Sequence, residues 1–132
     1  MSNIDADLDN LPLEKQLRIK RRRAVEDTIG IRWLIHEQDL KLEVYKESSY
    51  KLDLQLRDLN HAILLHTQLL SETDDDVHRV SIQILVEKLN PIAKESRDLE
   101  MYIDVTKRRI RNLEEELEHV YDTIDACSTL IC

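Results

Sequence analysis

Glycine, proline and phenylalanine are scarce in this 132-residue chain, which contains one Gly, two Pro and no Phe. A compact globular fold turns often, and it uses Gly and Pro where the backbone needs a positive or a fixed φ. Aromatic residues make up only 4% of the sequence, whereas 35% of the residues are charged. Leu, Ile and the charged residues Asp, Glu, Lys and Arg dominate instead. This composition is typical of long helices, and we predict an all-α protein.

Patterns that carry catalysis or bind metal ions are also missing. The two cysteines, Cys127 and Cys132, do not have the spacing of a zinc site or of a disulfide framework. The five histidines include no i, i+4 pair, and the sequence contains no glycine-rich phosphate loop and no nucleophile elbow. We therefore expect that the protein is not an enzyme and uses no cofactor, metal ion or small-molecule substrate.

Long apolar runs are absent as well, since none approaches the roughly 20 residues that cross a bilayer. Residues 1–10 are acidic and polar, unlike a signal peptide. The net charge of −8 gives no general attraction for nucleic acid or anionic lipid. We expect a chain without a membrane span that resides in the cytoplasm, including the cytoskeleton, with the nucleus as the alternative.

Apolar residues recur at heptad spacing in two long segments, one from Leu17 to Leu70 and one from Ile82 to Ile131. Sustained heptads predict coiled-coil helices. The sequence between them, Ser-Glu-Thr-Asp-Asp-Asp at 71–76, favours caps and turns because its side chains compete with the backbone for hydrogen bonds. The predicted organisation is a flexible acidic tail over 1–11 and a coiled-coil hairpin over 12–132, with a helix over 12–70, a turn over 71–76 and a helix over 77–131.

A turn this short makes the two helices antiparallel neighbours. The register that closes the hairpin most tightly pairs Leu52 with Ser96 and Tyr45 with Ile103, and it brings Arg32 near Glu114. The alternative is a parallel homodimer of one continuous helix.

Pro91 lies inside the second heptad segment. A proline in a helix interior removes one hydrogen bond and clashes with the preceding turn. Because the heptad phase continues across it, we expect a kink near Pro91, or a break at which Asn90 caps a new helix.

Large apolar residues also occur outside the seam, where a two-helix hairpin leaves them exposed. Exposed apolar patches often mark interfaces, and Trp is a favoured anchor residue. Either the chain folds back into a larger bundle of its own, or partner helices cover these residues. We favour partners, because Gly and Pro are too scarce for further turns. The candidate partner-binding residues are Ile29, Trp33, Leu40, Val44, Leu54, Leu64, Leu65, Val80, Ile84, Met101 and Val105.

A basic segment occupies residues 18–23. It can be a solvated helical face, or it can be a nuclear-localisation signal or a contact with an acidic polymer. The candidate basic patch consists of Arg18, Lys20, Arg21, Arg22 and Arg23.

The leading hypothesis is therefore a non-catalytic structural subunit, scaffold or adaptor of a larger cytoplasmic assembly of cytoskeletal or tethering type. Its expected partners are other coiled-coil proteins or further copies of itself in an oligomer. The alternative is a nuclear or nucleic-acid-associated regulatory coiled coil that uses residues 18–23.

Overall fold

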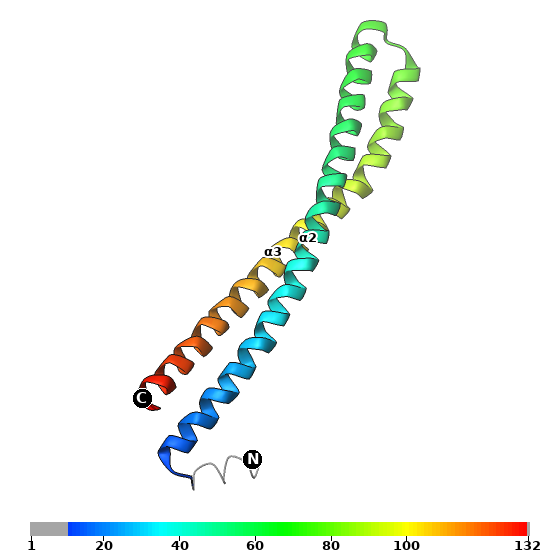
Figure 1. The fold of residues 1–132 in the computed structure, drawn as a ribbon. Coiled ribbons are helices and arrows are strands. Elements are labelled where there is room, and N and C mark those ends of the chain that lie inside the picture. The colour runs from blue at the N-terminus through cyan, green and yellow to red at the C-terminus, as the bar shows by residue number, and fades with distance from the viewer. Residues whose placement is uncertain (1–10, 132) are drawn as a thin grey trace. The chain divides into compact units, whose positions relative to one another are not determined.

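The computed structural model describes residues 11–131, and this part of the chain forms two α-helices (Figure 1). Helix α2 spans Leu13–Thr73 and helix α3 spans Asp76–Ile131. The two helices pack against each other, which confirms the predicted all-α helical hairpin. The tail predicted over residues 1–11 lies, except for Leu11, outside the described residues.

Helix α2 starts directly after Pro12, one residue later than predicted. The backbone carbonyl of Pro12 accepts a hydrogen bond from the Gln16 amide at 3.0 Å, and the Gln16 side chain donates to the carbonyl of Leu11 at 2.6 Å. The first turn is therefore held by both the main chain and the side chain of one residue.

The turn between the helices is shorter than the predicted turn over 71–76, because only Asp74 and Asp75 lie outside the helices. Ser71 and Thr73 stay helical, and their hydroxyl groups donate to backbone carbonyls in the preceding helical turn, each at 2.7 Å. The side chains that were expected to break the helix satisfy their hydrogen bonds inside it instead.

Two aspartates make the turn itself. Asp74 has a φ of 49°, in the left-handed region, and its amide donates to the carbonyl of Leu70 at 2.8 Å, which ends helix α2. The carboxylate of Asp75 accepts a hydrogen bond from the Val77 amide at 3.0 Å, so Asp75 caps the start of helix α3. Arg79 lies 3.8 Å from Asp74 and adds an exposed ion pair across the turn.

Helix α3 continues through Pro91 without interruption. The break capped by Asn90 is therefore excluded, and a kink near Pro91 stays a prediction. Helix α3 carries its apolar seam on both sides of this residue, so packing against helix α2 offsets the hydrogen bond that proline removes.

The chain divides into two compact units, each made of one stretch from each helix. Unit 1 comprises Met1–Asp39 and Arg108–Cys132, of which residues 11–39 and 108–131 are described. Unit 2 comprises Leu40–Lys107.

The seam of unit 1 contains small side chains. Its buried residues are Ala24, Thr28, Ile31, Ile110 and Cys127. Small residues at a helix contact shorten the distance between the helix axes. Cys127 is a buried free thiol in this seam.

The seam of unit 2 mixes apolar and polar layers. Its buried residues are Leu52, Ser96 and Thr106. Tyr45 stacks on Tyr102 with ring centroids 5.8 Å apart, and the Ser96 hydroxyl lies 3.5 Å from Asp53. Both contacts lie within one residue of the predicted pairing, whereas His66 contacts His78, four residues before the position that the same register places opposite it.

Two histidines form a further polar layer of unit 2. The Nδ1 atoms of His66 and His78 are 3.0 Å apart, and both rings are partly buried. A hydrogen bond between these two nitrogens requires one of them to donate and the other to accept.

Candidate partner-binding surface

Most of the predicted partner-binding residues are exposed in the structure. Leu54 and Val105 are half-buried and contribute less accessible surface than expected. The exposed members are Ile29, Trp33, Leu40, Val44, Leu64, Leu65, Val80, Ile84 and Met101. Ile29 and Trp33 belong to unit 1, and the other exposed members belong to unit 2. The two groups are therefore described separately.

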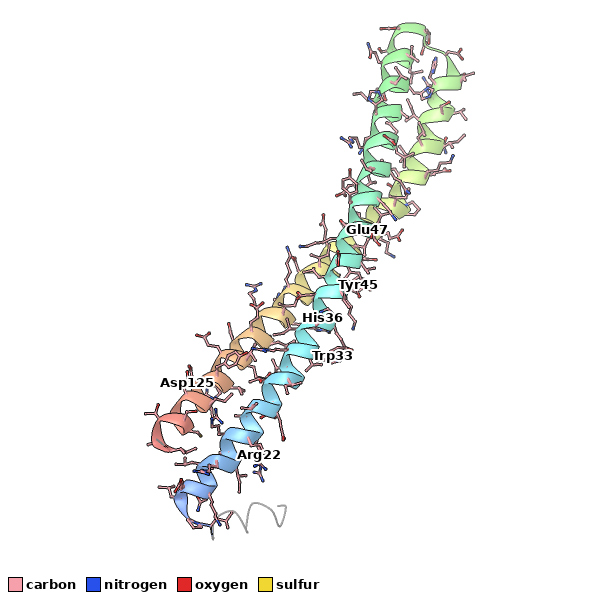
Figure 2. All side chains as sticks on the ribbon, viewed as in Figure 1. Arg22, Trp33, His36, Tyr45, Glu47 and Asp125 are labelled. Carbon is pink, nitrogen blue, oxygen red and sulfur yellow. The ribbon has the colours of Figure 1, made fainter. Side chains whose placement is uncertain are left out.

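Trp33 is the largest exposed apolar side chain of unit 1, with 63% of its surface accessible, and Ile29 one turn earlier is 67% accessible. The indole ring lies beside the His36 ring, with centroids 6.0 Å apart and planes tilted by 43° (Figure 2). Ile29, Trp33 and His36 follow one another at helical spacing, so they share one side of helix α2. We call these three residues the Trp33 face.

Gly30 leaves a hollow beside the Trp33 face. A Cβ atom at this position would meet nothing within 4 Å. Shallow depressions flank the indole on both sides: one is lined by Ile29, Gly30, Arg32, Trp33 and His36, and the other includes Glu26, Asp27 and Leu34. The helix surface is therefore concave next to its largest apolar side chain.

Two exposed apolar residues near this face were not among the predicted site residues. Val25 and Leu34 occupy positions that flank the seam, and the structure leaves both exposed. In a two-stranded coiled coil, flanking residues are partly covered, so heptad position alone does not reveal them. The helical spacing of Val25 from Ile29, and of Leu34 from Gly30, is the signal that could have found them.

The predicted basic patch is divided between two sides of helix α2. On one side, Arg18, Arg21 and Arg22 line a concave space of about 550 Å³, which we call the arginine hollow. Lys20 and Arg23 lie on the other side and line a different hollow together with Asp27. Successive residues of an α-helix point about 100° apart, so a continuous basic run does not make one basic surface. The residues lining the arginine hollow are Arg18, Arg21, Arg22, Val25, Ser128 and Ile131.

Both helices contribute to the arginine hollow. The Arg21 Nε donates to the Ser128 hydroxyl across the seam at 2.8 Å. Arg18 pairs with Glu14 at 2.8 Å within helix α2, and both of these side chains are exposed. Figure 2 marks Arg22 on the same helix as Trp33 and His36.

Arg32 does not make the flanking contact with Glu114 that the charge pattern predicts. Its guanidinium donates a hydrogen bond to the Tyr121 hydroxyl and lies 5.5 Å from the centre of that ring. A guanidinium stacks on an aromatic face as well as it pairs with a carboxylate at the surface, so this cation–π contact replaces the ion pair.

Among residues 11–131 no group of three or more His, Cys, Asp or Glu side chains converges as a metal site would require. In the same part of the chain neither helix has an apolar stretch long enough to span a bilayer. No protein-family model, curated protein or solved structure matches this chain.

Proposed function

We propose that this chain is a non-catalytic structural subunit or adaptor, and that the Trp33 face binds a helix of another protein. The single observation that supports this proposal is the exposure of Trp33 and Ile29 beside the hollow at Gly30. The seam holds the two helices together, while this face contributes nothing to that packing. It remains accessible for a partner.

The free energy of covering these side chains supports the proposal. Removing one large apolar side chain from water contributes about 1.5–3 kcal/mol. Trp is enriched among the residues that dominate binding energy in protein interfaces. Trp33 and Ile29 stay in contact with water in the hairpin. A docked helix would remove them from water, and this free energy would stabilise the complex.

Gly30 provides a second argument. A glycine inside a helix costs about 1 kcal/mol relative to alanine. Within the hairpin no neighbour requires this glycine, because the position of its missing Cβ faces open space. A partner side chain that packs into the hollow beside Trp33 would account for the cost.

The type of assembly is a further part of the proposal. We place the chain in a cytoplasmic assembly of cytoskeletal or tethering type, where long helical hairpins connect other coiled-coil subunits. This choice rests on the helical hairpin and its outer face, and it leaves the partner to be identified by experiment.

The alternative function, a nuclear or nucleic-acid-associated coiled coil, depends on the basic segment. Two features make it the weaker proposal. The five basic residues are divided between two sides of the helix, with Lys20 and Arg23 beside Asp27. The net charge of −8 would also repel a long polyanion from the rest of the chain.

The test compares two exposed aromatic residues in the full-length chain. Tagged wild-type, Trp33→Ala and Tyr50→Ala chains are expressed in cells, and the proteins that co-purify with each are quantified. Tyr50 is a matched control because it is 65% accessible. Unlike Trp33, it has the charged residues Lys46, Glu47 and Asp53 at helical spacing around it.

We expect Trp33→Ala to weaken partner binding by about 30-fold, the loss associated with a hot-spot residue, and Tyr50→Ala to leave it unchanged. If Trp33→Ala retains all partners of the wild type, the proposal is wrong. Sedimentation equilibrium of the purified chain then separates the two kinds of partner. A mass near 15.6 kDa assigns the Trp33 face to a different protein, and a multiple of it assigns the face to a second copy.

A further inference from the structure

The arginine hollow and the Trp33 face lie along one stripe of helix α2 within unit 1. Arg18, Arg22, Val25 and Ile29 follow one another at spacings of i, i+4, i+7 and i+11, and Trp33 continues the stripe one turn further. Residues at these spacings occupy one side of a helix. All five are exposed. The stripe is therefore basic at one end and apolar at the other.

We propose that the segment docking on the Trp33 face is an amphipathic helix with apolar residues in one half and carboxylates in the other, and that these carboxylates occupy the arginine hollow. This inference rests on the proposed function, and it specifies the chemistry of the partner. From Arg18 to Trp33 the stripe measures about 22 Å at 1.5 Å per residue, so a partner helix of about 15 residues covers it.

The hydrogen bonds in the hollow fit carboxylates. Ser128 engages only the Nε of Arg21, which leaves the two terminal amino groups of that guanidinium to bind a carboxylate. Arg22 makes no ion pair among residues 11–131. Arg18 pairs only with the exposed Glu14, and an exposed pair of this kind contributes about 0–1 kcal/mol and exchanges readily.

The walls of the hollow favour an amphipathic peptide over a polyanion. Val25 and Ile131 line the space together with the three arginines. A phosphate backbone gains nothing from these aliphatic side chains, whereas the methylene groups of Glu and a neighbouring Leu pack against them.

The experiment uses two designed peptides of about 18 residues, the length of a helix that covers the stripe with a turn to spare. Both carry Leu at helical spacing in one half and a fluorescent label. The other half carries Glu in the first peptide and Lys in the second. Fluorescence anisotropy measures their binding to the full-length chain, to Arg18→Glu/Arg22→Glu and to Trp33→Ala. The matched control is Arg57→Glu/Arg97→Glu, which makes the same charge change at two exposed arginines of unit 2.

We expect the Glu peptide to bind the wild type and the unit 2 control equally, and to bind Arg18→Glu/Arg22→Glu at least ~30-fold more weakly. The same charge-reversal variant should now prefer the Lys peptide. The neutral variant Arg18→Gln/Arg22→Gln should lose affinity for the Glu peptide without gaining any for the Lys peptide. Circular dichroism of each variant checks that the helices are intact.

Several results would overturn the inference. One is failure of the Glu peptide to bind the wild type, and another is equal binding of both peptides to the wild type and the charge-reversal variant. The third is tighter binding of a single-stranded oligonucleotide than of the Glu peptide, which would support the nucleic-acid alternative. Loss of binding in Trp33→Ala together with no effect of the arginine variants would refute this inference and leave the proposed function intact. The reverse pattern would refute the proposed function and this inference with it, because the arginines would then bind carboxylates without the Trp33 face.

Discussion

Unit 1 and unit 2 are built from the same two helices, but different types of residue are buried in their seams. Unit 1 buries small side chains such as Ala24, Thr28 and Cys127 next to isoleucines. In unit 2 two of the buried residues carry hydroxyl groups, Ser96 and Thr106. Among the described buried residues of unit 1 only Thr28 carries a hydroxyl group, and the small side chains there allow the helices to pack closely. Polar layers contribute less stability but restrict which register satisfies their hydrogen bonds.

The outer faces of the two units differ as well. In unit 1 the exposed Trp33 has Ile29, Gly30 and His36 as neighbours on the helix surface. In unit 2 the equally exposed Tyr50 is next to the ion pair of Glu47 and Lys51, with 3.5 Å between the charged atoms. The exposure of one aromatic side chain does not define a docking surface. The apolar character of its neighbours distinguishes the two positions.

The largest expected effect is a loss of stability when a residue in the seam of unit 1 is replaced, compared with a residue on its outer face. Ile31→Ala should lower the free energy of unfolding by about 2–4 kcal/mol, because Ile31 is only 6% accessible and its removal leaves a cavity. Ile29→Ala, two residues away on the exposed side, should change it by less than about 0.5 kcal/mol. Urea denaturation followed by circular dichroism measures both. Similar losses in the two variants would mean that Ile29 is covered within the hairpin.

Gln38 is a polar residue in the seam of unit 1. Its side-chain oxygen is buried and has no hydrogen-bond partner. Gln38→Leu should therefore raise the free energy of unfolding by about 1–3 kcal/mol, since an unsatisfied buried acceptor is removed. Thermal and urea unfolding provide the measurement. A lower stability would show that the amide is satisfied in solution, and that unit 1 also depends on a polar layer.

Replacing one histidine of the His66–His78 pair should change the stability of unit 2 differently from replacing both. His66→Leu alone leaves His78 without its partner and should lower the free energy of unfolding by about 1 kcal/mol. The double variant His66→Leu/His78→Leu replaces the pair by an apolar layer and should be at least as stable as the wild type. A double-mutant cycle from urea unfolding measures this coupling. Additive effects of the two single substitutions would contradict the contact.

Gly30→Ala should produce a small change in stability and also a change in binding. An alanine at this helical position meets no neighbour, so the free energy of unfolding should rise by about 1 kcal/mol. If a partner packs into the hollow beside Trp33, the added methyl group should weaken binding. A variant that is more stable and binds its partner as well as the wild type would show that the hollow at Gly30 is not part of the interface.

The sequence predicted the hairpin because many heptad positions contribute apolar residues to the seam. A few polar residues at such positions do not change the pattern. Tyr45 stacks on Tyr102, the residue next to its predicted partner Ile103. The boundaries of the turn were predicted less well. They depend on individual hydrogen bonds, such as those that keep Ser71 and Thr73 in helix α2.

Prediction of the candidate site was weakest for the charged residues. Arg32 lies on Tyr121 rather than beside Glu114, since surface contacts of similar free energy compete and the rotamer decides between them. The basic run likewise predicted one patch, whereas the helix places Lys20 and Arg23 on a different side from the arginine hollow. The exposed positions of Trp33 and Ile29, in contrast, follow directly from the heptad assignment.

The most direct test of the central claim uses the fact that Trp33 is the only tryptophan of the chain. Incorporating 5-fluorotryptophan gives a single fluorine resonance, and its shift between H₂O and D₂O reports the solvent exposure of the indole. We predict a large solvent shift for the purified chain, and its loss when the proteins that co-purify with the tagged chain are added. A solvent shift that stays the same in the bound chain would contradict the proposal that a partner covers the Trp33 face.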